Sequence, residues 1–212
     1  MTGAAVQLYG AAYSVYVRAV RLALEEKDVA YDLIPVDIFA EGGPPADYAA
    51  RQPFLKIPAL EHDGFRLYET GAILRYLDAA FPVPPLGPEG LRARARQDQI
   101  MGILDAYAYR TWVWDIYVER VAKPAEGGAA DEERIERALP KAALALDAIA
   151  DLMTGDPYFL GERPCLADLL AGPMIAYLRE AKEGTALIGE RPRWAAWWRA
   201  LAQRPSWKAV SA

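Results

Sequence analysis

The sequence predicts an α/β domain followed by an all-helical domain, and three observations support this prediction. Short apolar runs alternate with a helical pattern over residues 1–81, which is typical of an α/β arrangement. From residue 89 to residue 212, apolar residues recur at helical spacing only. The segment 82–88 between these regions is rich in proline, which favours a linker. We therefore expect domains at 1–81 and 89–212.

The first domain begins with an apolar run from Val6 to Tyr9 that predicts a strand. Ser14 then opens a helix through about Glu26, and Lys27 is expected among its solvent-facing residues. The residues from Tyr31 to Val36 predict a second strand. Because strand–helix–strand crossovers are right-handed, these two strands should be parallel neighbours.

Residues 53–77 predict a loop, two short strands joined by a tight turn, and a helix. The runs Ile-Pro-Ala-Leu-Glu and Phe-Arg-Leu-Tyr flank the turn His-Asp-Gly, and a periodic apolar run follows Thr70. His62, the only histidine, is expected at the surface of this turn. A strand, a helix and a strand followed by such a ββα unit is the thioredoxin-like arrangement.

The second domain contains only predicted helices. They cover about 89–121, 131–153, 166–182 and 192–203, with a short helix after Pro205. Pro140 and Pro173 fall within two of these segments, where proline is expected to kink a helix or to lie near its start.

Composition and charge exclude several classes of function. The net charge of -5 gives no electrostatic footprint for nucleic acid. No apolar stretch is long enough to span a bilayer and no signal sequence precedes the first strand, so we expect a cytoplasmic protein without a membrane partner. The single Cys165 excludes an internal disulfide, a Cys-x-x-Cys pair and a cysteine zinc cluster. Any thiol chemistry must use a thiol brought by a substrate.

Two features of residues 53–77 point to a ligand. Pro58 begins a strand, and Glu69-Thr70 opens a helix whose first amides have no partner within the helix. A cis Ile57-Pro58 bond would turn the Ile57 backbone groups toward an extended peptide, and the helix start would bind a carboxylate. Glutathione has that shape. Taken singly, Pro58 is also explained as the start of an edge strand and Thr70 as a helix cap.

These motifs resemble a known family. The run Phe-Leu-Lys-Ile-Pro-Ala-Leu, followed by Leu-Tyr-Glu-Thr-Gly-Ala-Ile, is similar to the glutathione-binding half of cytosolic glutathione transferases. In the second half, Phe159-Leu160-Gly161, Ala167-Asp168-Leu169 and Trp197-Trp198 resemble the family's buried capped helix and the C-terminal signature of its phi class and bacterial relatives. The resemblance thus covers nearly the whole chain.

The resemblance implies a homodimeric enzyme that joins the glutathione thiolate to hydrophobic electrophiles or reduces organic hydroperoxides. Glutathione would be the co-substrate, with no further cofactor and no metal. The helical domain would shape the electrophile site. A relative that keeps the fold for binding or assembly, without catalysis, is the alternative, and turnover with a halogenated nitroarene would separate the two. The natural electrophile is not specified by the sequence.

The resemblance also assigns site residues. It places the catalytic hydroxyl at Ser14, which would donate a hydrogen bond to the glutathione sulfur, although Ser14 alone would be interpreted as a helix cap. Tyr13 is the alternative donor. The implied glutathione-binding residues are Lys56, Ile57, Pro58, Glu69 and Thr70, and the implied electrophile pocket contains Tyr13, Tyr109, Trp112 and Tyr117.

Two positions depart from the family pattern. Cys165 stands where a serine or threonine is usual, so the helix cap is expected to depend on Asp168 reaching back to the amide near Cys165. Gly43-Pro44 stands where phi-class enzymes typically place a histidine for the glycine carboxylate of glutathione. Lys56 is the nearest replacement, and Arg51 or the backbone of the Gly42-Gly43 loop are the alternatives.

Overall fold

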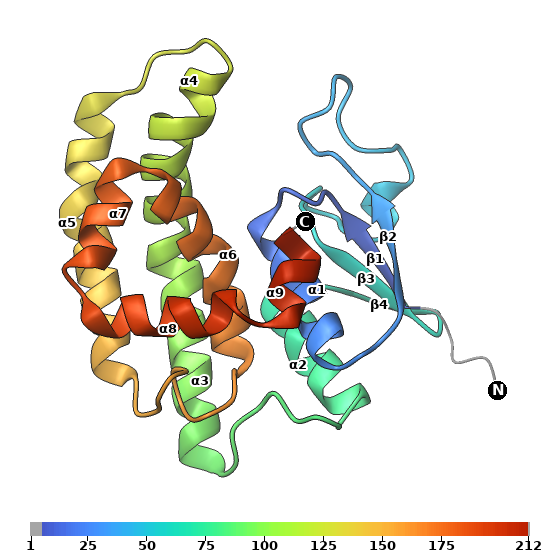
Figure 1. The fold of residues 1–212 in the computed structure, drawn as a ribbon. Helices are drawn as coiled ribbons and strands as arrows, with labels where there is room; N and C mark the ends of the chain where they lie inside the picture. Colours follow the sequence, from blue (N-terminus) through green and yellow to red (C-terminus); the bar gives the residue numbers. More distant parts are fainter. Residues whose placement is uncertain (1–5, 212) are drawn as a thin grey trace. The chain divides into compact units, whose positions relative to one another are not determined.

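The computed structural model describes residues 6–211 and divides the chain into two compact units. Unit 1 contains the residues up to Leu86 and those from Pro205 onward, and unit 2 runs from Gly87 to Arg204 (Figure 1). The chain therefore passes from one unit to the other twice. The expected bounds were 1–81, 82–88 and 89–212; in the structure, residues 82–86 and the C-terminal helix both pack with unit 1.

Unit 1 contains a four-stranded mixed sheet in the order β2-β1-β3-β4. The strands are β1 (Val6–Gly10), β2 (Tyr31–Pro35), β3 (Ala59–His62) and β4 (Phe65–Tyr68). Strands β1 and β2 are parallel, whereas β3 is antiparallel to both β1 and β4. The predicted thioredoxin-like domain, with its parallel first pair and its ββα unit, is confirmed.

The helices of unit 1 lie together on one side of this sheet (Figure 1). They are α1 (Val15–Glu26), α2 (Thr70–Ala80) and α9 (Pro205–Ser211), and a single 3₁₀ turn, η1 (Tyr48–Ala50), precedes β3. Helix α1 buries Val17, Val20 and Leu24, which recur at helical spacing and form one apolar stripe. The expectation that Lys27 faces solvent is wrong, because its ammonium is buried against the backbone of residues 81–84.

Helices are the only regular secondary structure in the described residues of unit 2. It contains α3 (Leu91–Ile103), η2 (Leu104–Ala108), η3 (Arg110–Ala122), α4 (Lys123–Ala125), α5 (Glu132–Leu152), α6 (Leu166–Glu180), α7 (Lys182–Gly189) and α8 (Pro192–Ala202). The first four form one continuous helical run, in which η2 and η3 are π-helical. The amide of Lys123, for example, bonds to the carbonyl of Val118, five residues earlier.

Helix α7 is absent from the prediction, which treated 166–182 as a single helix. Helix α6 ends at Glu180, and the backbone of the next residue, Ala181, is extended. Gly184 allows the start of α7 to approach the end of α6 closely, since a Cβ on Gly184 would lie 1.9 Å from the carbonyl oxygen of Leu178. Pro140 and Pro173 lie inside α5 and α6, as predicted.

The core of unit 2 surrounds the start of α6. The buried carboxylate of Asp168 accepts hydrogen bonds from the amides of Cys165 (2.8 Å) and Phe159 (3.0 Å) and from Trp197 Nε1 (2.6 Å). Asp168 therefore reaches back to the Cys165 amide, which confirms the expected cap. Burial raises the pKa of the Cys165 thiol well above its usual value.

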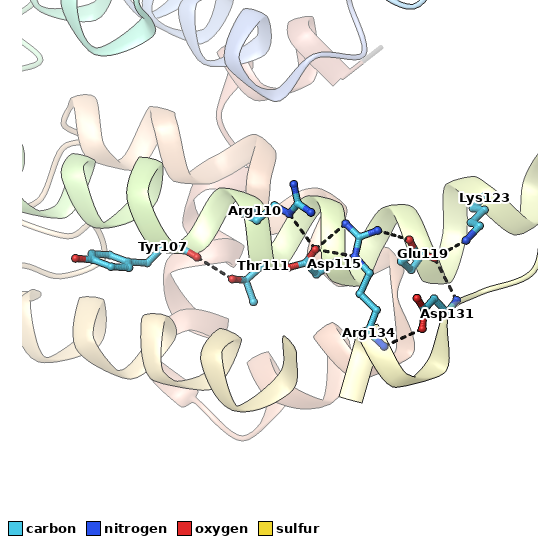
Figure 2. A network of polar contacts seen from close by, with 8 residues as sticks. All are labelled: Tyr107, Arg110, Thr111, Asp115, Glu119, Lys123, Asp131 and Arg134. Atoms are coloured by element: carbon cyan, nitrogen blue, oxygen red, sulfur yellow. Dashed lines mark hydrogen bonds and ion pairs between the residues drawn. The ribbon is translucent and has the colours of Figure 1, made fainter. Parts of the chain in front are cut away.

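A second polar network joins η3 to the start of α5 (Figure 2). Glu119, which is only 3% exposed, accepts hydrogen bonds from Arg134 (2.6 Å), Lys123 (2.9 Å) and the amide of Asp131 (3.1 Å). Arg134 also bonds Asp115. The network fixes the segment that connects α4 to α5, which contains Gly127 and Gly128.

Candidate active site

Three strand ends meet at one edge of the sheet of unit 1. In the register of the sheet, Tyr9 near the end of β1 faces Ala59 at the start of β3, and Ala59 in turn faces Tyr68 at the end of β4. Ser14 follows β1, Pro58 precedes β3 and Glu69 follows β4. Strand pairing therefore gathers the three predicted elements of the glutathione site along the same edge.

Gly10 allows β1, α1 and the segment before Pro58 to lie close together. A Cβ on Gly10 would lie 2.4 Å from Val17 Cγ2 in α1 and 3.4 Å from the Cβ of Ile57. Only a residue without a side chain allows β1 to approach both the first turn of α1 and the segment before Pro58. The sequence did not indicate this contact, because Gly10 and Ile57 lie far apart in the chain.

Ser14 caps the N-terminus of α1. Its backbone is extended and its hydroxyl oxygen accepts a long hydrogen bond, 3.4 Å, from the amide of Val17. A serine hydroxyl that accepts one hydrogen bond can still donate its own hydrogen. The first turn of α1 carries no acidic side chain, so its partial positive charge is available to an anion beside Ser14.

Tyr13 is directed to a different partner. Its phenol donates a 2.7 Å hydrogen bond to Asp37, which also accepts from the amide of Phe39 at 2.9 Å. The Tyr13 and Phe39 rings stack with centroids 6.2 Å apart. The hydrogen bond from Tyr13, followed by that from the Phe39 amide, lowers the pKa of Asp37. No sequence pattern indicated Asp37 or Phe39, since neither belongs to the quoted motifs.

The segment before β3 has the predicted geometry. The Ile57-Pro58 peptide bond is cis, as expected from the sequence. The buried Tyr48 hydroxyl donates to the carbonyl of Lys56 at 2.7 Å, and burial raises the pKa of Tyr48 to about 12, so the hydroxyl keeps its proton. This contact fixes the backbone of Lys56, whose side chain is exposed. Lys56 is therefore held beside Ile57 while its ammonium remains accessible.

The start of α2 is built from an unusual backbone conformation. Glu69 precedes the helix with φ 70° and ψ 112°, a backbone conformation that residues other than glycine rarely adopt. Thr70 is the first helical residue and is buried. Since the first amides of a helix have no intrahelical partner, this end of α2 can bind a carboxylate.

Two further residues of unit 1 differ in their surroundings. The Arg51 guanidinium lies over the Tyr9 ring at 4.7 Å and contacts carboxylates of Asp47 (3.1 Å) and Glu61 (3.9 Å), so its charge is already balanced. His62, which was expected at the surface, is partly buried. Its side chain is 14% exposed, and Nδ1 lies 2.8 Å from the Tyr76 hydroxyl.

The remaining predicted pocket residues belong to unit 2, whereas Tyr13 belongs to unit 1. Tyr109 is half-buried, and burial raises its pKa. Tyr117 stacks on Tyr177 with centroids 4.2 Å apart. Trp112, in contrast to the expectation of a pocket wall, is a core residue: it has no exposed surface and its Nε1 donates to the carbonyl of Ala142.

Residues 6–211 lack both a metal-binding cluster and a membrane-spanning helix. This part of the chain contains no group of three or more side chains suited to holding a metal ion. None of its helices combines the length and the apolar character needed to cross a bilayer.

Comparisons with known proteins identify the family of this chain. Residues 8–88 match the family model for the N-terminal domain of glutathione S-transferase, and residues 132–200 match that for its C-terminal domain. Glutathione S-transferase F10 of Arabidopsis thaliana is 30% identical over 97% of this chain and 95% of the relative.

Two solved structures show the same fold. Glutathione transferase F7 from Populus trichocarpa is 30% identical with a TM-score of 0.84, and the match covers 97% of each chain. Glutathione S-transferase I from maize, solved with an atrazine–glutathione conjugate, is 27% identical with a TM-score of 0.84, and the match covers 98% of this chain and 97% of that one. The fold and these matches thus identify a thioredoxin-like domain followed by a helical domain. The chain belongs to the glutathione S-transferase family, whose reaction is glutathione conjugation.

Proposed function

We propose that Ser14 activates the thiol of glutathione for attack on a hydrophobic electrophile. The observation that carries this proposal is the position of the Ser14 hydroxyl at the N-terminus of α1, on the sheet edge shared with Pro58 and Glu69. The sulfur of a peptide-like ligand on this edge would lie near both a hydroxyl donor and the positive end of a helix. Both favour the thiolate over the thiol.

The energy required is modest. A free thiol has a pKa of about 8.5, so lowering it by about two units takes about 2.7 kcal/mol of preferential thiolate stabilisation. One donor hydrogen bond to a charged group contributes about 1.5 to 3 kcal/mol, and a helix terminus adds about 0.3 to 1 kcal/mol. Ser14 and α1 together can therefore supply the shift, with Ser14 acting as neither nucleophile nor base.

Tyr13 is the weaker candidate for this role because its phenol proton already bonds Asp37. We assign Tyr13, a residue that is 43% exposed, to the wall of the electrophile site. Tyr109 and Tyr117 remain proposed members of that site. The backbone of Ile57, held by the cis bond to Pro58, would pair with the cysteinyl part of glutathione, and the start of α2 at Glu69 and Thr70 would bind a carboxylate.

The maize relative was solved with an atrazine–glutathione conjugate, which supports halogenated aromatic electrophiles as the substrate class. In such a reaction the glutathione sulfur forms a bond to the ring carbon, the carbon–halogen bond breaks and halide leaves. The thiol proton passes to solvent when the thiolate forms. Reduction of organic hydroperoxides is a second proposed reaction, in which two glutathione molecules supply two electrons and are joined as the disulfide, while the O–O bond breaks and an alcohol and water leave.

Comparison of Ser14→Ala with Tyr13→Phe tests the assignment. Titration of the thiolate absorbance of bound glutathione against pH should give a higher thiol pKa for Ser14→Ala, and turnover should fall about ten- to a thousand-fold because one preorganised donor is lost. Tyr13→Phe should leave the titration unchanged. The opposite pattern would transfer the role to Tyr13. A wild type without turnover on a halogenated nitroarene would favour the non-catalytic binding or assembly protein.

We further propose a cytoplasmic homodimer in which unit 1 binds glutathione and the helices of unit 2 contribute to the electrophile site. The helices after Thr70 and after Glu89 would meet their two-fold copies in an isologous interface, where each contact occurs twice. Light scattering should give twice the mass of one chain at micromolar concentration. The mass of a single chain would contradict the dimer.

A further inference from the structure

We propose that α9, the C-terminal helix, positions Ser14 by bracing α1 from the side. This inference rests on the proposed role of Ser14. It gives a function to α9, a helix that follows unit 2 in the sequence but belongs to unit 1. Helix α9 follows the whole of unit 2 in sequence, yet it packs on α1 (Figure 1). The brace consists of Arg18 and Glu26 on α1 and of Ser206, Trp207 and Ser211 on α9.

The contacts span the length of α1. At its C-terminal end, the Ser206 hydroxyl donates to the carboxylate of Glu26. Near its first turn, Arg18 Nη2 donates to the Ser211 hydroxyl at 3.2 Å, and the same guanidinium lies 5.3 Å from the centroid of the Trp207 ring. The start of α9 thus meets the end of α1, and the end of α9 meets the start of α1. The two helices are antiparallel.

Helix α9 depends on this docking. It has seven residues, and isolated helices of that length are not stable in water. Three of its residues are nevertheless buried: Ser206 is 6% exposed, Trp207 is 8% exposed and Val210 is 4% exposed. Because the helix would not form without its apolar contacts, its position reports a specific packing arrangement with α1.

Arg18 connects the brace to the site. Its amide donates to the carbonyl of Ser14 at 2.9 Å, which closes the first turn of α1, while its side chain bonds α9. The internal bond of the Ser14 hydroxyl to the Val17 amide is long, at 3.4 Å, and holds the hydroxyl only weakly. The direction of the hydroxyl therefore depends on the backbone of this turn, which α9 supports through Arg18.

Three variants test the brace in the full chain. Arg18→Met keeps the apolar stem but removes both contacts to α9, and Trp207→Leu removes the ring under the guanidinium. Trp207→Phe retains a ring there. Arg21→Met is the matched control, since Arg21 lies on the next turn of α1 and bonds Tyr31 instead. The thiol pKa of bound glutathione, with kcat and KM, is measured for each folded variant.

We expect Arg18→Met and Trp207→Leu to raise the thiol pKa and to lower kcat about three- to tenfold near neutral pH, because a small displacement of a preorganised donor is costly. The KM for glutathione should change little, Trp207→Phe should restore the wild-type titration, and Arg21→Met should match wild type. Arg18 is half-exposed, so Arg18→Met decides the matter even where Trp207→Leu unfolds unit 1.

Two failures can be told apart. If Ser14→Ala shifts the titration but Arg18→Met does not, α9 has only a structural role and the inference is overturned. If Ser14→Ala itself leaves the titration unchanged, the proposed role of Ser14 is contradicted. The inference about α9 is then contradicted as well, because it depends on that role.

Discussion

The ammonium of Lys27 lies 2.7 Å from a carboxylate oxygen of Asp78, where the last turns of α1 and α2 meet. The same ammonium donates to the carbonyls of Phe81 (2.7 Å) and Pro84 (2.8 Å), and Asp78 also accepts from the amide of Leu86 (2.8 Å). All three ammonium hydrogens thus have acceptors, and the Lys27 side chain has no exposed surface. One lysine fixes the segment through which the chain leaves unit 1.

We predict that Lys27→Met lowers the free energy of unfolding by about 3 to 5 kcal/mol, because it leaves a carboxylate and two carbonyls without their buried partner. Chemical denaturation measures the change. Lys141→Met, at an exposed position of α5, is the control and should stay within about 0.5 kcal/mol of wild type. An equally small effect for Lys27→Met would show that water replaces the ammonium.

Gly10→Ala should damage stability and catalysis together. The added methyl group would collide with Val17 in the first turn of α1. We expect a loss of about 1 to 3 kcal/mol in stability from overpacking, and a fall in kcat/KM of about tenfold or more as Ser14 moves. Gly102→Ala on α3 is the control: its Cβ meets nothing within 4 Å, so it should be neutral or stabilising by up to about 1 kcal/mol. Wild-type kinetics for Gly10→Ala would refute the argument.

Lys56→Ala should weaken glutathione binding. Arg51 is paired with Asp47 and Glu61, whereas the Lys56 side chain is exposed beside Ile57, which makes Lys56 the better candidate for the glycine carboxylate. Loss of one charge-assisted hydrogen bond, about 1.5 to 3 kcal/mol, should raise the KM for glutathione about ten- to a hundredfold.

The saturated rate of Lys56→Ala should remain near wild type, as expected when binding is lost equally from the ground and transition states. Lys56→Arg keeps the charge and serves as the control. Unchanged glutathione affinity in Lys56→Ala would leave the backbone amides of the Gly42-Gly43 loop as the binding group.

Glu119→Gln should lower stability in a pH-dependent way. Although burial acts to raise it, the hydrogen bonds from Lys123 and from the Asp131 amide hold the pKa of Glu119 below its usual value. The folded pKa therefore lies below the unfolded value of about 4.3, so the carboxylate stabilises the fold above that pH, and its contribution disappears as the pH falls through the folded pKa.

The difference in unfolding free energy between wild type and Glu119→Gln should be about 1.5 to 3 kcal/mol at pH 7 and should shrink below about pH 4. Denaturation at several pH values measures it. Glu133→Gln, which alters an exposed pair with Arg137, should change stability by less than about 1 kcal/mol. A pH-independent difference would mean that the charge of Glu119 is unimportant.

Local sequence signals predicted the elements of unit 1 because turn residues, caps and apolar periodicity act over a few positions. The strand–helix–strand order, the cis bond before Pro58 and the helix start after Glu69 are all confirmed. The reach of Asp168 to the Cys165 amide was also predictable, because both groups lie in one helical turn.

Contacts between distant residues were not predictable in the same way. Lys27 was expected in solvent. Its burial could not be predicted from local sequence, because its carbonyl acceptors lie 54 and 57 residues further along the chain. Helix α9 was grouped with its neighbours in sequence, although its apolar residues fit α1. Trp112 was placed in the electrophile pocket by the family resemblance, which did not indicate that this part of the helical run is π-helical and that Trp112 is buried in the core.

The burial of Cys165 has a practical consequence for assays. Cys165 is the only cysteine of the sequence. The residue is 4% exposed, and the pKa of its thiol is raised. A thiol-specific reagent should therefore react with the co-substrate and leave the folded enzyme unlabelled. Glutathione consumption can then be counted by thiol titration even at enzyme concentrations comparable to those of the substrate, and slow turnover of an unknown electrophile becomes measurable without following the product.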